Sequence, residues 1–309
     1  MAARPTRNLD FRRELALDKT NFISYYTNII SFVPKERPMT TQYLTHQSGR
    51  IAYDDAGSGP LVLCAPSMGD VRAEYRFLAP FLVDAGFRVV TMDLRGLGES
   101  STQWHDFSVA GIGGDMLALI RHLDSGPAVI IGASMAAGAA VWAAAEAPAH
   151  VAGLVLIGPF VRGETSATNA LLYSLLFNQL WGVRAWQWYY STLYPTRKPA
   201  DFAAYIAALG ANLREPGRLK ALQAMMRAPK TASAERVGGV MAPTLVMMGS
   251  KDPDFPEPQA EAQWVADAVR GRHLMVDGAG HYPHAEMPEV TAPLIVNFLQ
   301  AQQAVRHVA

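Results

Sequence analysis

Short, uninterrupted apolar runs recur along most of this chain, and segments with helical spacing separate them. Examples lie at 61–65, 127–131 and 151–157. A strand that faces water on one side alternates apolar and polar residues, whereas a continuous apolar run is typical of a strand covered on both faces. Half of the 309 residues are apolar, which is enough for one large core. The pattern therefore predicts an α/β fold, a mainly parallel sheet with helices on both faces.

One of these runs breaks into small residues around a serine. The apolar segment 127–131 leads through Gly132 to Ser134 and then into an alanine-rich helix expected over 135–147. A strand that turns sharply into a helix holds its turn residue at strained backbone angles, so its neighbours must be nearly free of side chains. The serine would then lie at a helix N-terminus, where free N–H groups and the helix dipole favour an oxyanion.

The string Gly132-Ala133-Ser134-Met135-Ala136 resembles the nucleophile elbow G-x-S-x-G of the α/β-hydrolase superfamily, with alanine in place of the last glycine. The resemblance covers residues 41 to the C-terminus. It implies an α/β-hydrolase fold in which Ser134 is the nucleophile. A serine hydroxyl is a weak nucleophile near neutral pH, so the chemistry also needs a base and a group that orients the base.

The resemblance assigns the other two members of the triad. His281 lies in a loop that is similar to the family's G-x-G-H loop, and Asp252 matches the acid position of the family's G-x-x-D-x-x-x-P segment. The chain order Ser, Asp, His is the order of this family. His284 is an alternative base, but we expect it to be a solvated loop residue. Asp254 is an alternative acid that could instead contact solvent.

The oxyanion site departs from the family pattern. The family has a His-Gly pair after its third strand and takes an N–H from the next residue, whereas the aligned string here is Ala65-Pro66-Ser67-Met68. Proline has no N–H, so Pro66 is excluded. The alignment implies that the backbone N–H groups of Ser67 and Met135 form the oxyanion hole.

The loop from Asp93 to Ser100 matches the D-x-R-G-x-G-x-S loop that is common in the family. We interpret it as structural, because its glycines allow a compact turn and its charged pair, Asp93 and Arg95, would hold the turn in place. The single cysteine, Cys64, lies in an apolar run and is interpreted as a core residue.

The sequence divides into an N-terminal helical extension at 1–40, an α/β-hydrolase core at 41–159 and 241–309, and an insertion at 160–240. The insertion contains no convincing strand and many aromatic residues, and prolines divide it into several helices. In this position it resembles the helical cap that covers the active site in many α/β-hydrolases.

Composition limits the partners. Basic and acidic residues balance at 27 each, so charge does not favour nucleic acid or an anionic membrane. The apolar run at 22–33 is shorter than the roughly 20 residues of a membrane-spanning helix. We expect a cytoplasmic protein without an integral membrane segment, with a homodimer as one possibility and an export or membrane-surface role for the extension as an alternative. The triad requires no metal or organic cofactor.

These features predict a capped serine hydrolase that cleaves carboxylic esters of small to medium apolar substrates through an acyl-enzyme. Two alternatives use the same scaffold with a Ser-Met elbow: hydrolysis of a carbon–carbon bond in a diketone, and a cofactor-free perhydrolase or haloperoxidase reaction. A further alternative, of another class, is a ligand-binding or signalling protein with little turnover. An apolar ester or ketone is the expected small-molecule partner in the enzymatic interpretations.

Overall fold

The computed structural model describes residues 40–163 and 175–308, so the predicted extension at 1–40 lies almost wholly outside the described residues. Eight strands form one sheet in the order β1-β2-β4-β3-β5-β6-β7-β8. The strands are β1 (Gln42–His46), β2 (Gly49–Ala56), β3 (Leu61–Ala65), β4 (Arg88–Met92), β5 (Ala128–Ala133), β6 (Val151–Ile157), β7 (Thr244–Gly249) and β8 (Arg272–Val276).

The sheet is mainly parallel, as predicted. Only the pairs β1–β2 and β2–β4 are antiparallel, and every other neighbouring pair is parallel. The register pairs Ala65 of β3 with Gly132 of β5. The turn that follows β3 is therefore placed beside the turn that contains Ser134.

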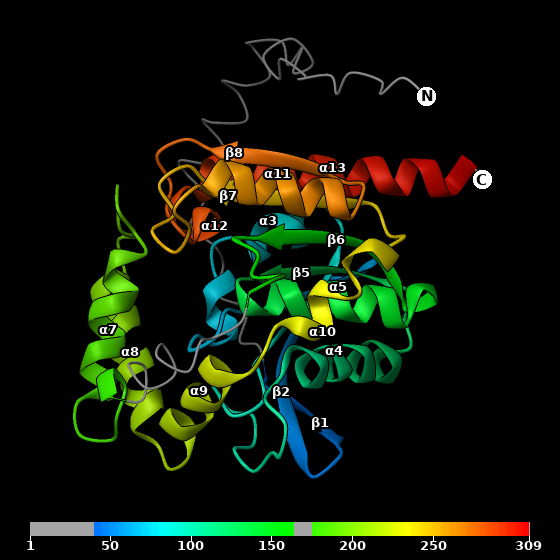
Figure 1. The fold of residues 1–309 in the computed structure, drawn as a ribbon. Helices are drawn as coiled ribbons and strands as arrows, with labels where there is room; N and C mark the ends of the chain where they lie inside the picture. Colours follow the sequence, from blue (N-terminus) through cyan, green and yellow to red (C-terminus); the bar gives the residue numbers. More distant parts are fainter. Residues whose placement is uncertain (1–39, 164–174, 309) are drawn as a thin grey trace. The chain divides into compact units, whose positions relative to one another are not determined.

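Helices cover both faces of the sheet (Figure 1). One face packs on α4 (Val109–Leu123), α5 (Met135–Glu146) and α11 (Pro258–Ala268). The other packs on α3 (Ala79–Asp84) and α13 (Pro288–Val308). The two resulting cores contain the apolar strand residues, among them the fully buried Cys64, which confirms that the apolar runs are strands covered on both faces.

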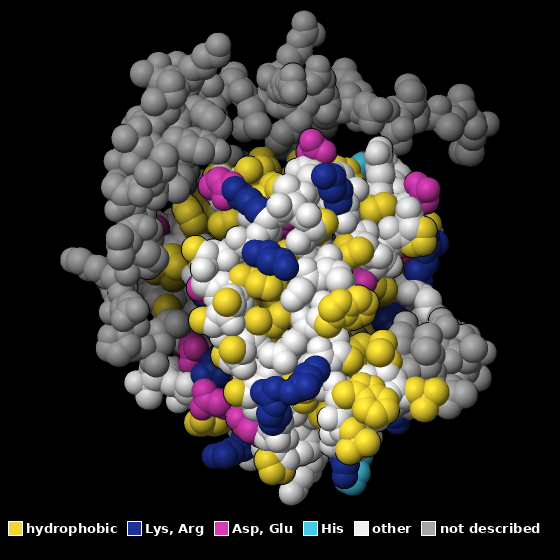
Figure 2. Space-filling model, turned by 90° about the vertical axis from the view of Figure 1, so that its left-hand side faces the viewer, with side chains coloured by type: hydrophobic (Ala, Val, Ile, Leu, Met, Phe, Trp, Pro, Cys, Tyr) yellow, Lys and Arg dark blue, Asp and Glu magenta, His cyan; other side chains and the backbone are white. Residues whose placement is uncertain are grey.

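Residues 175–240 contribute helices rather than strands to the described structure. They form α7 (Gly182–Thr192), α8 (Phe202–Arg214), α9 (Arg218–Arg227) and the short α10 (Thr231–Ala234), all between β6 and β7. We call these four helices the helical insertion. Figure 1 shows α7, α8 and α9 beyond the carboxyl ends of the strands, the edge at which parallel α/β sheets bind ligands. Figure 2 shows apolar side chains between separate basic and acidic groups on this side of the molecule.

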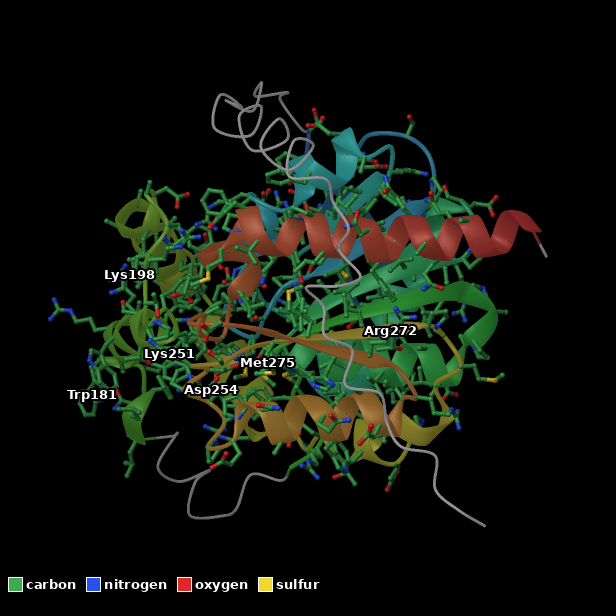
Figure 3. All side chains as sticks on the ribbon, turned by 90° about the horizontal axis from the view of Figure 1, so that it is seen from above. Trp181, Lys198, Lys251, Asp254, Arg272 and Met275 are labelled. Carbon is green, nitrogen blue, oxygen red and sulfur yellow. The ribbon has the colours of Figure 1, made fainter. Side chains whose placement is uncertain are left out.

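Figure 3 gives the direction of the sheet relative to the insertion. Strand β8 runs from Arg272 toward Met275, and Asp254 lies beyond that end, on the side of Trp181. Short helices complete the core, namely η1 (Arg72–Tyr75) after the turn that follows β3 and α12 (Pro283–Glu286) after β8. None of the helices in the described ranges combines the length and apolar character that crossing a bilayer requires.

The prediction that Asp93 and Arg95 pair with each other within the 93–100 loop is wrong. Asp93 accepts hydrogen bonds from the backbone N–H and the guanidinium of Arg72 in η1, and Arg95 pairs with Asp115 of α4 at 2.7 Å. Each charge is thus neutralised by a residue that is distant in sequence, and both carboxylates and Arg95 are buried. The loop is held by two ion pairs to different elements, which keeps its structural role but changes its partners.

Candidate active site

Ser134 occupies the strained turn between β5 and α5. Its φ is +55° and its ψ is −120°, in the left-handed half of backbone space that a serine rarely adopts. The turn is crowded, because a Cβ on Gly132 would lie 2.6 Å from the carbonyl oxygen of Ala136. Ser134 N–H also donates to the Ile157 carbonyl at 2.8 Å, which fixes the turn to the end of β6. The local geometry thus has the form of a nucleophile elbow.

His281 and Asp252 come together from the loops after β8 and β7. His281 Nδ1 lies 2.7 Å from Asp252 Oδ2, and both side chains are buried. Burial lowers the pKa of His281, but the carboxylates of Asp252, then Asp254, and finally Glu74 raise it more, to about 9. The pair therefore has the geometry and charge of a base oriented by an acid.

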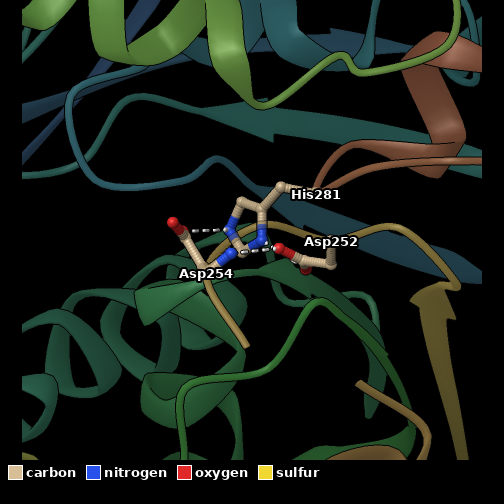
Figure 4. A group of neighbouring side chains, drawn as sticks. All are labelled: Asp252, Asp254 and His281. Atoms are coloured by element: carbon tan, nitrogen blue, oxygen red, sulfur yellow. Dashed lines mark hydrogen bonds and ion pairs between the residues drawn. The ribbon is translucent and has the colours of Figure 1, made fainter. Parts of the chain in front are cut away.

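Asp254 lies at the other nitrogen of the same ring (Figure 4). Its Oδ2 is 3.8 Å from His281 Nε2, while Tyr189 of α7 donates a hydrogen bond of 2.6 Å to its Oδ1. Burial raises the pKa of Asp254, and the charge of His281 and the Tyr189 hydrogen bond oppose this. The alternative prediction that Asp254 contacts solvent is therefore wrong. Its carboxylate is hydrogen-bonded to Tyr189 of the insertion and faces the imidazole of His281.

These groups meet at a cavity of about 280 Å³ under the insertion. Ser134, Met135 and His281 line it from the core side, as does Asp254. Apolar and aromatic walls come from Trp186 of α7 and Met226 of α9, and from Phe177 shortly before α7. A cavity at the small end of the range for ligand sites, with few polar groups at one end, is suited to a small or medium apolar molecule.

The turn after β3 differs from the expectation for Ser67. Ser67 N–H donates to Glu74 Oε2 at 2.7 Å, in a buried contact, so this N–H already has an acceptor. Met68, the next residue, lines the cavity. Glu74 is not among the predicted site residues, because a carboxylate seven residues after Ser67 carries no local sequence signal of this contact.

A network of buried polar groups lies behind this turn. His284 Nε2 is 3.0 Å from Glu74 Oε1, and His284 is fully buried, so the prediction of a solvated loop residue is wrong. Asp70 accepts hydrogen bonds from the hydroxyl groups of Tyr190 at 2.6 Å and Tyr205 at 2.5 Å. Burial raises the pKa of Asp70 to about 8 and that of Glu74 to about 7, and lowers that of His284 to about 3. Two insertion helices, α7 and α8, are therefore bound through Asp70 to the turn that follows β3.

Asp252, Asp254 and His281 are also the group of described residues whose spacing could hold a metal ion, with ligand atoms within 4.8 Å of one another. However, the two carboxylates lie at opposite nitrogens of one ring. A single ion could not bind both carboxylates and a ring nitrogen while the Asp252 hydrogen bond persists. The arrangement is that of a hydrogen-bonded base rather than of a metal centre.

Comparison with known proteins agrees with this geometry. The family described as alpha/beta hydrolase fold matches residues 60–288. A 2-(acetamidomethylene)succinate hydrolase from Mesorhizobium japonicum is 31% identical over 272 residues, which cover 82% of this chain and 93% of that protein.

Solved structures share the fold at lower identity. A bromoperoxidase from Bacillus anthracis superposes with a TM-score of 0.74 at 17% identity, over 84% of this chain and all of that one. A thermophilic esterase from Thermogutta terrifontis, with malate bound, gives a TM-score of 0.72 at 23% identity, over 85% of this chain and 99% of that one. At these identities the two structures establish a common architecture only.

Proposed function

The chain belongs to the α/β-hydrolase fold family, and we propose that within this family it is a serine hydrolase that cleaves carboxylic esters through an acyl-enzyme. One observation carries the proposal. Ser134, in its strained elbow, lines the same cavity as the buried His281, and His281 Nδ1 is hydrogen-bonded to Asp252 at 2.7 Å. These three residues supply a nucleophile, a base and an acid that orients the base.

In the proposed mechanism, Ser134 Oγ attacks the ester carbonyl while His281 Nε2 takes its proton. Asp252 accepts the hydrogen bond from Nδ1–H, keeps the ring in the required tautomer and stabilises its positive form. His281 then gives the proton to the departing alkoxide, which leaves as an alcohol and forms the acyl-enzyme. A water molecule, activated by the same nitrogen, releases the carboxylic acid and restores Ser134.

We assign the oxyanion hole to the backbone N–H groups of Met135 and Met68. Met135 is the first residue of α5, where N–H groups have no partner within the helix. Met68 replaces Ser67 in this role because the Ser67 N–H is bonded to Glu74, whereas Met68 lines the cavity beside Ser134. Glu74 therefore acts as a positioning residue that holds the turn while the next N–H faces the substrate.

The substrate body should be apolar. Phe177, Trp186 and Met226 form much of the cavity wall opposite the triad. Each methylene that contacts such a wall contributes about 0.8 kcal/mol, so kcat/KM should rise by about tenfold for each added pair of carbons until the cavity is full. The cavity of about 280 Å³ should fill with a short or medium chain and reject long ones.

A second function on the same site is hydrolysis of a carbon–carbon bond in a diketone. The observation that favours it is the Ser134–Met135 elbow, because a Ser-Met elbow also occurs in such enzymes and in cofactor-free perhydrolases. The same base and oxyanion groups would serve either reaction.

A substrate panel tests the proposal. We would assay nitrophenyl esters from acetate to palmitate, a diketone, and peroxide-dependent bromination, each with the natural protein and with Ser134→Ala. The proposal predicts an optimum at short or medium esters and a loss of a thousandfold or more in Ser134→Ala. A flat or steadily falling ester series would contradict the apolar cavity. A diketone or bromination rate far above every ester would replace ester hydrolysis with that reaction.

A further inference from the structure

One cation lies in the wall of the catalytic cavity. Lys230 follows α9, is partly buried, and is the only lysine or arginine among the described residues that line the cavity with Ser134 and His281. The described chain gives Lys230 no ion pair with any carboxylate. By contrast, Arg76, which follows η1, and Arg197, between α7 and α8, pair with Asp201 and Glu289, respectively.

The position of Lys230 is fixed relative to the elbow. Its carbonyl accepts hydrogen bonds from the N–H groups of Ser233, at 3.0 Å, and Ala234, at 3.2 Å, which start α10. Ser233 Oγ in turn donates to the carbonyl of Gly138 in α5 at 2.8 Å. Helix α5 begins directly after Ser134, and Figure 1 shows α10 beside it. The lysine backbone is therefore anchored to the helix that carries the nucleophile.

One aromatic ring, Phe160, neighbours both the ammonium group and the base. Lys230 Nζ lies 5.8 Å from the centre of the Phe160 ring, and that ring centre is 5.9 Å from the centre of the His281 ring. The Phe160 ring is thus within contact distance of both the ammonium group and the imidazole. The cavity of about 280 Å³ that Lys230, Ser134 and His281 line together has room for a short chain between a charged group at Lys230 and a carbonyl at Ser134.

Within the described residues, no carboxylate pairs with this ammonium, which has only the face of the Phe160 ring nearby. Burial lowers the pKa of Lys230, and among the described residues no neighbouring charge opposes that effect. The carboxylate of the cavity, Asp254, instead faces His281 and is bound to Tyr189. A partly desolvated cation without a counter-ion is unfavourable for the free protein, and a bound anion would remove that cost.

We infer that the cavity selects an ester whose acyl chain ends in a carboxylate, with Lys230 as its counter-ion. This inference rests on the proposed function and narrows it to half-esters of short dicarboxylic acids. The methylenes between the two ends would contact Phe160 and the apolar wall, while the ester carbonyl lies at Ser134. Lys230 is therefore a specificity-determining residue rather than part of the catalytic machinery.

Matched pairs of substrates test this inference. We would measure kcat/KM by acid release for the monomethyl esters of succinate, adipate and suberate, each beside the neutral methyl ester of the same chain length. In the natural protein at least one half-ester should exceed its neutral counterpart by about tenfold. In Lys230→Met that ratio should fall about tenfold, and Lys230→Arg should keep most of it. Lys198→Met, which removes an exposed charge of the insertion outside the cavity, is the control and should keep the ratio.

Equal ratios in the natural protein and in Lys230→Met would overturn the inference while ester hydrolysis itself stands. If no ester is turned over, the proposed function fails, and binding decides the inference separately. Calorimetry would then compare monomethyl adipate binding to Ser134→Ala and to Ser134→Ala with Lys230→Met. A Kd about tenfold weaker in the double variant supports the inference, and equal or undetectable binding in both overturns it.

Discussion

The second carboxylate at His281 gives a prediction whose size follows from the geometry. A negative charge at Asp254 Oδ2, 3.8 Å from His281 Nε2, stabilises the protonated ring. At about 4 Å such an attraction amounts to roughly 1 kcal/mol in water and roughly 4 kcal/mol at an effective dielectric constant of 20. The Asp254 side chain is 14% exposed, so we expect an intermediate value. With about 1.4 kcal/mol for each pH unit, Asp254→Asn should lower the pKa of His281 by about one to two units.

The sign follows from the role of the base. His281 acts in its neutral form, so kcat/KM falls as the pH drops through its pKa, which is raised to about 9. Asp254→Asn should move this acidic limb to lower pH and increase kcat/KM at pH 7 by about tenfold or more, because the neutral fraction of a group titrating above pH 7 rises roughly tenfold for each unit by which its pKa falls. The asparagine oxygen can still accept the Tyr189 hydrogen bond, so the insertion should keep its contact.

The assay is a pH profile of kcat/KM for one neutral ester between pH 5 and 10. Asp84→Asn, which removes an exposed carboxylate at the end of α3, is the matched control and should leave the limb in place. An acidic limb that does not move in Asp254→Asn, or that moves to higher pH, would refute this account of Asp254. A loss of turnover as large as that of Asp252→Asn would instead make Asp254 the orienting acid.

Three further predictions concern the buried carboxylates. Asp252→Asn should reduce kcat by about a thousandfold or more, because the His281 ring is then no longer held in the required tautomer and its protonated form is no longer stabilised. A loss below tenfold in initial-rate assays would exclude Asp252 as the orienting acid. Glu74→Leu should lower kcat at least tenfold with a smaller change in KM. Glu74→Gln should keep most of the rate, because the glutamine oxygen can still accept the hydrogen bond from Ser67 N–H. Equal kcat values in the natural protein, Glu74→Leu and Glu74→Gln would show that Glu74 does not position the site. The pKa of Asp70 is raised to about 8, above its value of about 4 in an unfolded chain, so its contribution to stability should be lost as the pH rises between these values. Urea unfolding should therefore show a weaker decline in stability from pH 6 to 8.5 in Asp70→Asn, and an unchanged slope would contradict the raised pKa.

The strands and the elbow could be predicted because their signals are local. A continuous apolar run defines a strand covered on both faces, and the small residues around Ser134 are required by the crowding that a Cβ on Gly132 would meet. The approach of His281 to Asp252 also followed, because parallel strands end at one edge of the sheet.

The partners of buried charges could not be predicted in the same way. His284 and Glu74 are 210 residues apart in sequence, and Arg95 pairs with Asp115 rather than with the nearby Asp93. Such contacts depend on which helix packs on which loop, and no periodicity encodes that choice. The same limit explains Lys230, whose place in the cavity wall follows from the packing of α10 on α5.

The central claim is that Ser134 forms a covalent acyl-enzyme, and trapping this residue tests it most directly. We would treat the natural protein and Ser134→Ala with a fluorophosphonate, measure intact mass, and locate the label by peptide mass spectrometry. The account predicts one phosphonyl group per natural chain, on Ser134, and none on the alanine variant. No labelling of the natural protein, or equal labelling of the variant at another residue, would contradict it.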